Sequence, residues 1–170
     1  LAETGLVPDR TGNIKMGMGK NNDKKKLKGF ICDWVYVSIK NPKKSIFTQY
    51  FTSQDILPIQ VNHGEGCFMI DHNNQEKIKD NTIIQYTNSK GEIISKFPIN
   101  PNGSVMNLAG ITTDDGRICA MMPHPERALT IKQIPTWMNN HYSNNKKERL
   151  KTTNDNEVWL TLFKGFKDGL

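Results

Sequence analysis

Hydrophobic residues in this chain gather in short runs separated by polar turns, which is typical of strands rather than of long helices. Within 28–39 an alternation places Phe30, Cys32, Trp34 and Tyr36 on one face, and the other face is also partly apolar. This predicts a strand buried on one side and partly covered on the other. Further strands are predicted over 56–61, 67–70, 82–87, 92–96, 108–112 and 117–122, with hairpin turns at 88–91 and 114–116.

Helical patterning is concentrated near the end of the chain. Over 157–168, Val158, Leu162 and Phe166 fall on one stripe beside Trp159 and Phe163, which predicts an amphipathic helix packed on the sheet. Residues 73–79 are expected to form one or two helical turns, and 127–133 the start of another helix. Two stretches rich in Asn, Lys and Gly interrupt these elements, and we expect a mobile loop over 9–28 and a polar insertion over 134–156.

The length of 170 residues suits one domain over 1–170, and 36% hydrophobic and 24% charged residues are typical of a globular protein. No apolar run approaches the roughly 18 residues of a membrane span, and the start of the chain has no signal-peptide pattern. Cys32, Cys67 and Cys119 are odd in number and widely spaced, which favours reduced thiols over a disulfide framework or a metal site. These features predict a cytoplasmic protein without a bound metal.

The net charge of +6 comes mainly from lysines at 20–28, 40–44 and 146–151. These lysines lie among Asn, Asp and Gly, which indicates solvated loops, whereas nucleic-acid surfaces usually combine basic residues with aromatic ones. We therefore expect neither a nucleic-acid nor a membrane partner. A phosphate-bearing substrate or an acidic partner domain would benefit more from this charge.

The candidate chemistry lies at the end of the run Ile118–Met122, where two prolines alternate with a base and an acid. Pro123 and Pro125 disfavour helical geometry in the residues before them, so side chains two positions apart are expected to point the same way. The Glu126 carboxylate would then accept a hydrogen bond from one ring nitrogen of His124, leaving the other to take a proton from a nucleophile. The alternative is that His124 and Glu126 form an ordinary surface pair without a catalytic role.

The segment Met-Met-Pro-His-Pro-Glu-Arg-Ala over 121–128 resembles the signature of class I, triad-type glutamine amidotransferases, most closely the glutaminases of phosphoribosylformylglycinamidine synthases. Other segments resemble those enzymes in the same order and at similar spacings, up to about residue 129. They are Leu-Ala-Glu-Thr-Gly-Leu-Val-Pro (1–8), Phe-Ile-Cys-Asp-Trp-Val-Tyr (30–36), His-Gly-Glu-Gly (63–66), Asn-Pro-Asn-Gly-Ser (100–104) and Asn-Leu-Ala-Gly-Ile (107–111).

The resemblance implies an α/β fold of the flavodoxin-like amidotransferase type, with β-hairpin additions. Leu1–Thr4 is similar to the end of the family helix that follows the nucleophilic cysteine. We therefore expect this chain to be the C-terminal part of one glutaminase domain, incomplete at its N-terminus and without the first strands, the oxyanion-hole loop and the nucleophile.

The resemblance also implies roles for individual residues. His124 would act as the base and Glu126 would orient it, and both are expected to be catalytic. Asn62, His63 and Gly64 would lend backbone groups to the glutamine pocket, although a tight turn with a structural His63 is an open alternative. Cys67 departs from the residue that the family most often has after the second glycine. The loop 100–104 would lie near the active site, or would simply be a turn.

The implied activity is hydrolysis of glutamine to supply ammonia to an ATP-dependent synthetase domain or subunit in purine biosynthesis. No cofactor is expected in this chain, while ATP and magnesium are implied on the partner synthetase. Because Cys32 and Cys119 lie in predicted strands and Cys67 lacks a helix N-terminus, none of them is expected to be the nucleophile, and this stretch alone is expected to be inactive. The alternative is a non-catalytic docking module with an amidotransferase scaffold. A different triad amidotransferase is disfavoured because the segments at 63–66 and 100–104 are not general to that class.

Overall fold

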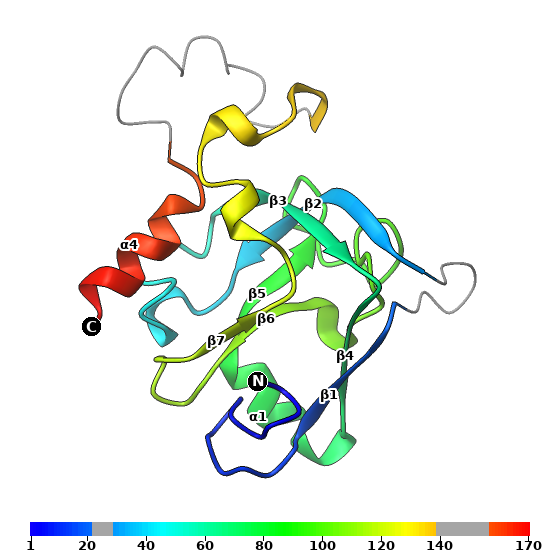
Figure 1. The fold of residues 1–170 in the computed structure, drawn as a ribbon, viewed down its shortest axis with the longest axis vertical. Helices are drawn as coiled ribbons and strands as arrows, with labels where there is room; N and C mark the ends of the chain where they lie inside the picture. Colours follow the sequence, from blue (N-terminus) through cyan, green and yellow to red (C-terminus); the bar gives the residue numbers. More distant parts are fainter. Residues whose placement is uncertain (22–28, 139–156) are drawn as a thin grey trace.

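A five-stranded antiparallel sheet forms the centre of the molecule, in a computed structural model that describes residues 1–21, 29–138 and 157–170 (Figure 1). Each neighbouring pair of strands in this sheet runs antiparallel. In spatial order the strands are β3 (Ile56–His63), β2 (Ile31–Ile39), β5 (Thr82–Thr87), β6 (Leu108–Thr112) and β7 (Cys119–Met121). These strands confirm most of the runs predicted from hydrophobic alternation.

The sheet curls until its two outer strands are joined. The backbone N–H of His124, three residues after β7 ends, donates to the carbonyl oxygen of Gln60 in β3 at 2.8 Å. Because β3 and β7 stand at opposite ends of the strand order, this antiparallel bridge connects the first strand of the sheet to the chain leaving the last. The position of His124 is therefore fixed by two strands far apart in the sequence.

The outer strand β7 is half-buried and divides two hydrophobic clusters. Cys119 and Met121 pack against the larger cluster, while Ile118, Ala120 and Met122 pack against the smaller one. This alternation follows the period of two that a strand imposes on its side chains. The strand predicted over 117–122 is therefore present but shorter, because only Cys119–Met121 forms β7, and it is only partly buried.

A second, two-stranded sheet pairs β1 (Met16–Lys20) antiparallel with β4 (Glu65–Ile70). The prediction of a loop is therefore wrong for 16–20. Met16 is buried in the smaller cluster, and the glycines between it and Lys20 are tolerated because the strand has a backbone partner in β4. The rest of that prediction, at 22–28, lies outside the described residues. Since β4 follows β3 after Gly64 alone, the two sheets are directly connected.

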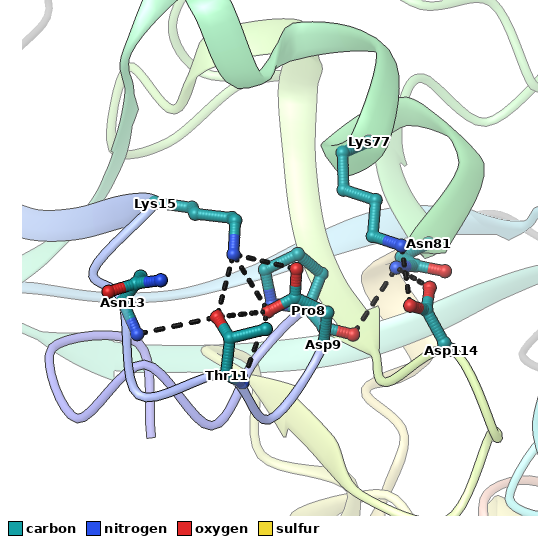
Figure 2. Close-up of polar contacts among 8 residues, drawn as sticks. All are labelled: Pro8, Asp9, Thr11, Asn13, Lys15, Lys77, Asn81 and Asp114. Atoms are coloured by element: carbon teal, nitrogen blue, oxygen red, sulfur yellow. Dashed lines mark hydrogen bonds and ion pairs between the residues drawn. The ribbon is translucent and has the colours of Figure 1, made fainter.

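The loop before β1 is held by hydrogen bonds rather than free in solvent (Figure 2). Asp9 accepts from the Lys15 ammonium at 2.9 Å and from the Thr11 hydroxyl at 2.9 Å. Nearby, Asn81 donates to the Pro8 carbonyl at 3.3 Å and to Asp114 at 2.9 Å, so one amide joins this loop to the β6–β7 turn.

In the part of the chain that the structure describes, two α-helices flank the sheets, α1 (Gln75–Asn81) and α4 (Leu160–Asp168). Just before α4, Trp159 is fully buried and its indole N–H donates to the Pro58 carbonyl in β3 at 2.8 Å. Val158, Trp159 and Leu162 form the buried stripe. Phe166 was predicted to belong to it but is 38% exposed and stacks on Phe47, with ring centroids 5.2 Å apart.

Two local predictions are wrong. Residues 92–96 do not form a strand, because side chains bind that backbone: Asn88 Oδ1 accepts from the N–H of Glu92 at 3.0 Å, and Asn107 Nδ2 donates to the Ile94 carbonyl at 3.0 Å. The helix expected at 127–133 is replaced by short 3₁₀ turns at Pro125–Arg127 and Ile131–Gln133.

The polar insertion predicted for 134–156 is described only up to residue 138. In that part Ile134 and Met138 are buried in the larger cluster, and Thr136–Met138 is a 3₁₀ turn. Residues 139–156 lie outside the described residues. Among the helices of the described chain, none is long and apolar enough to cross a membrane.

Candidate active site

The imidazole of His124 and the carboxylate of Glu126 meet, with Nδ1 and Oε1 2.7 Å apart. The route by which they meet differs from the one predicted. His124 is extended, but Pro125 begins a 3₁₀ turn in which the N–H of Arg127 donates to the His124 carbonyl at 3.2 Å. Proline favours the first position of such a turn because its φ is preset and it needs no N–H partner there. The turn, and not an extended backbone, brings the acid back beside the base.

This geometry selects one tautomer of the imidazole. A carboxylate accepts hydrogen bonds only, so Nδ1 carries the proton and Nε2 has a free lone pair. The side chains of His124 and Glu126 are 32% and 53% exposed, so the pair lies at the surface of the described chain. An oriented imidazole of this kind can act as a general base toward a group brought to Nε2.

Strand β3 supports the turn that carries the pair. Arg127 extends from the turn over β3, and its Nη1 donates to Gln60 Oε1 at 3.1 Å. With its carboxamide oxygen facing the guanidinium, Asn62 accepts from both terminal nitrogens of Arg127 at 2.9 Å. Gln60 and Arg127 were not identified from the sequence. The signal available for Gln60 was its spacing of two from Asn62, which puts both side chains on one face of a strand.

His63 points away from that face and is buried. Its Nδ1 lies 3.0 Å from Asn21 Oδ1, and Asn21 Nδ2 donates to the His63 carbonyl at 2.7 Å. Burial lowers the pKa of the His63 imidazole below its usual 6.5. A β-carbon at Gly66 would collide with the His63 ring, so this glycine is required for the ring to lie where it does. The side chain of His63 therefore has the structural role that the sequence left open.

Gly64 lies at the turn between β3 and β4, where its carbonyl accepts from the Asn21 backbone N–H at 3.0 Å. Together with Phe30, Cys67 and Met69 it lines a cavity of about 830 Å³. Neither His124 nor Glu126 is among the described residues lining that cavity. The structure thus brings Asn62 to the His124 turn through Arg127, whereas His63 and Gly64 face Asn21.

The three cysteines do not resemble activated nucleophiles. Cys67 is buried and burial raises the pKa of its thiol, and burial raises the pKa of Cys119 to about 12. Cys32 is exposed near the start of β2, where its sulfur lies 3.7 Å from Gln60 Nε2. Reactive cysteines usually lie at a helix N-terminus or beside a cation. Among the described residues, no group of three or more His, Cys, Asp or Glu side chains is arranged to hold a metal ion.

The loop 100–107 is largely buried and connects the two sheets. Ser104 Oγ accepts from the N–H of Phe68 at 3.0 Å and lies 3.2 Å from the Gly66 carbonyl, so the loop is tied to β4. Asn107 adopts a left-handed φ of 53° and donates to the Tyr86 carbonyl at 3.1 Å. These contacts give the loop a clear role in supporting the segment 63–66.

A mixed α/β domain that presents a carboxylate-bound imidazole just beyond a strand has the features of a class I glutamine amidotransferase. The sequence profile of the CobB/CobQ-like glutamine amidotransferase domain matches residues 1–167. This chain belongs to that family of class I glutamine amidotransferases.

Its relatives include subunits of phosphoribosylformylglycinamidine synthases. The chain is 36% identical over 138 residues to phosphoribosylformylglycinamidine synthase subunit PurQ of Dehalococcoides mccartyi, covering 81% of this chain and 51% of that protein. It is 39% identical over 101 residues to the subunit of the same name from Methanocaldococcus jannaschii, covering 58% of this chain and 43% of that protein. The chain thus spans about half the length of these curated relatives.

A solved structure has a similar fold. The structure of PurLQS from Thermotoga maritima matches with a TM-score of 0.59 and 20% identity, over 98% of this chain and 55% of the matched chain. The similarity extends over almost all of this chain, so the curled antiparallel sheet described above is a part of the class I amidotransferase fold.

Proposed function

We propose that this chain is part of the glutaminase of a phosphoribosylformylglycinamidine synthase, which hydrolyses glutamine and supplies ammonia to an ATP-dependent synthetase. The observation that carries the proposal is the 2.7 Å contact between His124 Nδ1 and Glu126 Oε1 in a chain of this family. A synthetase domain or subunit is the proposed partner, and ATP and magnesium would bind there.

In the proposed mechanism the nucleophile is a cysteine thiol from another part of the complete protein. His124 Nε2 takes the proton from that thiol, and the thiolate attacks the side-chain carbonyl carbon of glutamine. The proton then passes from His124 to the leaving amide nitrogen, which departs as ammonia. Water hydrolyses the glutamyl thioester to glutamate and restores the thiol. Glu126 holds the tautomer of His124 and stabilises the imidazolium formed between these steps.

Asn62, His63 and Gly64 enter the proposal as backbone along the glutamine pocket. The side chain of Asn62 is bound to Arg127, and the side chain of His63 is bound to Asn21. Their side chains are therefore already paired within the chain, so only backbone atoms of this segment are proposed to face glutamine. The cytoplasm is the proposed location, in keeping with three unpaired cysteines.

His124→Ala in the complete enzyme tests the proposal. We expect glutamine-dependent synthesis to fall by at least about 100-fold, because general base catalysis is lost, while synthesis with added ammonium salt stays near the wild-type rate. Equal loss of both activities, or retention of the glutamine-dependent one, would contradict a catalytic role for His124.

We also propose that the 170 residues by themselves release no ammonia from glutamine, because none of their cysteines is an activated thiol. The purified chain is assayed next to its Cys32→Ser and Cys67→Ser variants. Ammonia release that disappears in either variant would show that the nucleophile lies within these residues.

The alternative proposal is a non-catalytic module that uses the amidotransferase scaffold to dock on a synthetase. It is favoured only by the state of the three cysteines, and docking gives no physical reason for an imidazole hydrogen-bonded to a carboxylate. In that case His124→Ala would leave glutamine-dependent synthesis unchanged.

A further inference from the structure

The guanidinium of Arg127 joins the turn that carries His124 and Glu126 to strand β3. Its Nη1 lies 3.1 Å from Gln60 Oε1, and, with the Asn62 carboxamide oriented oxygen-first toward the guanidinium, both Nη1 and Nη2 lie 2.9 Å from that oxygen. Its Nε lies 3.8 Å from Glu126 Oε1, the oxygen that also contacts His124. One planar group therefore contacts two side chains of β3 and approaches the acid of the proposed catalytic pair.

These contacts have a geometry that arginine alone supplies. The guanidinium is a rigid fork with five donors, whereas a lysine ammonium is a single point charge on a flexible stem. Two acceptors spaced two residues apart on one strand face are matched by this fork. The carboxamides of Gln60 and Asn62 are neutral acceptors, so they hold the guanidinium in place while its charge stays available to Glu126.

The backbone alone leaves the acid less restrained than the base. His124 is fixed by its N–H bond to the Gln60 carbonyl at 2.8 Å. Glu126 is 53% exposed, and within the described part of the chain its side chain contacts His124 and Arg127. An exposed glutamate has several rotamers of similar energy, most of which would break its contact with the imidazole. A cation held against β3 favours the rotamer that keeps Glu126 Oε1 between the imidazole of His124 and the guanidinium of Arg127.

We propose that Arg127 is a positioning residue, which uses Gln60 and Asn62 as its anchors to hold Glu126 against His124. The proposal rests on the proposed glutaminase function, because the rate of glutamine hydrolysis is one of its readouts. It assigns Arg127 no contact with glutamine. Asn62 thereby acquires a second role, as an anchor, in addition to its backbone position.

The experiment compares Arg127→Gln and Arg127→Lys in the complete enzyme, with Arg10→Gln as the matched control. Arg10 also pairs with a carboxylate, Asp115 at 3.0 Å, but on the β6–β7 turn. We expect Arg127→Gln to lower kcat for glutamine by about 10- to 100-fold, with KM for glutamine within about 3-fold of wild type and ammonia-dependent synthesis retained. Arg127→Lys remains impaired because lysine cannot serve both anchors, and Arg10→Gln matches wild type.

A spectroscopic readout separates positioning from general structural damage. In the wild type, the Nδ1 proton of His124 should give a downfield NMR resonance typical of a carboxylate-bound imidazole, which His124→Ala identifies. We expect this resonance to weaken or vanish in Arg127→Gln while the unfolding midpoint stays within a few degrees of wild type.

A double variant tests the anchors. If Asn62 acts through Arg127, Asn62→Ala combined with Arg127→Gln should lower kcat no further than Arg127→Gln alone. Unchanged kcat in both Arg127 variants, a loss confined to KM, equal loss of ammonia-dependent synthesis, or strictly additive losses in the double variant would each overturn the proposal. Failure of the glutaminase function itself would be recognised separately, because His124→Ala would then leave glutamine-dependent synthesis intact.

Discussion

His124 and Gln60 share a single backbone hydrogen bond of 2.8 Å that joins the two ends of the curled sheet. The same pair of segments is joined a second time by the Arg127 side chain, which donates to Gln60 Oε1 at 3.1 Å. The proposed base therefore stands where the sheet closes, and β3 is the strand that determines its position.

Glu126→Gln is expected to lower glutamine hydrolysis in the complete enzyme by on the order of 100-fold. The amide keeps the shape of the carboxylate but has no charge to stabilise the imidazolium of His124. The measurement is the steady-state rate of ammonia release from glutamine. Glu76→Gln is the matched control, because Glu76 is exposed and lies 3.9 Å from Lys79 on α1. A wild-type rate for Glu126→Gln would show that the 2.7 Å contact has no part in catalysis.

Gly66→Ala is expected to destabilise the protein by about 1–3 kcal/mol, because the added methyl group collides with the buried ring of His63. Chemical denaturation measures the free energy of unfolding. Gly17→Ala serves as the control, since a β-carbon there meets nothing within 4 Å. The two substitutions should therefore differ clearly although both replace a strand-region glycine. Equal stability of the two variants would mean that the His63 ring moves aside at little cost.

Acidification is expected to destabilise the protein below pH 6.5 through His63. Burial lowers the pKa of His63 in the folded state, so the unfolded chain binds a proton first as the pH falls. Its contribution to stability is present above pH 6.5 and declines at lower pH, by at most about 1.4 kcal/mol per pH unit, until the folded-state pKa is reached.

The measurement for this prediction is the free energy of unfolding from pH 7.5 to pH 5, for the wild type and His63→Gln. The variant should show a shallower decline over this range, whatever its absolute stability. Carboxylates act in a different window, because hydrogen bonds from Lys15 and Lys77 lower the pKa values of Asp9 and Asp114 below 3.8. Parallel curves for the two proteins would exclude His63 as the titrating group.

The sequence predicts the strands well where side chains alternate between two apolar faces, as in β2, and it correctly brings His124 and Glu126 together. The prediction of strands fails where side chains, rather than a neighbouring strand, form hydrogen bonds with the backbone. Asn88 and Asn107 bind the backbone around 92–94, and neither contact has a local signature that would distinguish it from a hairpin. β1 was missed because its glycines weaken the strand pattern, although Met16 is buried against the core.

The contacts at the candidate site that could not be predicted from the sequence were missed for a similar reason. The pairing of Arg127 with Gln60 joins residues 67 positions apart, and the pairing of His63 with Asn21 joins residues 42 apart. Such contacts depend on strand register and sheet curvature, which hydrophobic periodicity does not determine. The contact between His124 and Glu126 was easier to predict because these residues are two positions apart and separated by a proline.

The hydrogen bond from Trp159 to Pro58 spans 101 residues of sequence and ends two residues before Gln60. During synthesis on the ribosome, this anchor of β3 cannot form until the tryptophan has left the exit tunnel, long after the strand itself has emerged. The region around β3 and the His124 turn should therefore be among the last to mature, and a nascent chain stalled before Trp159 should be unusually sensitive to protease near β3.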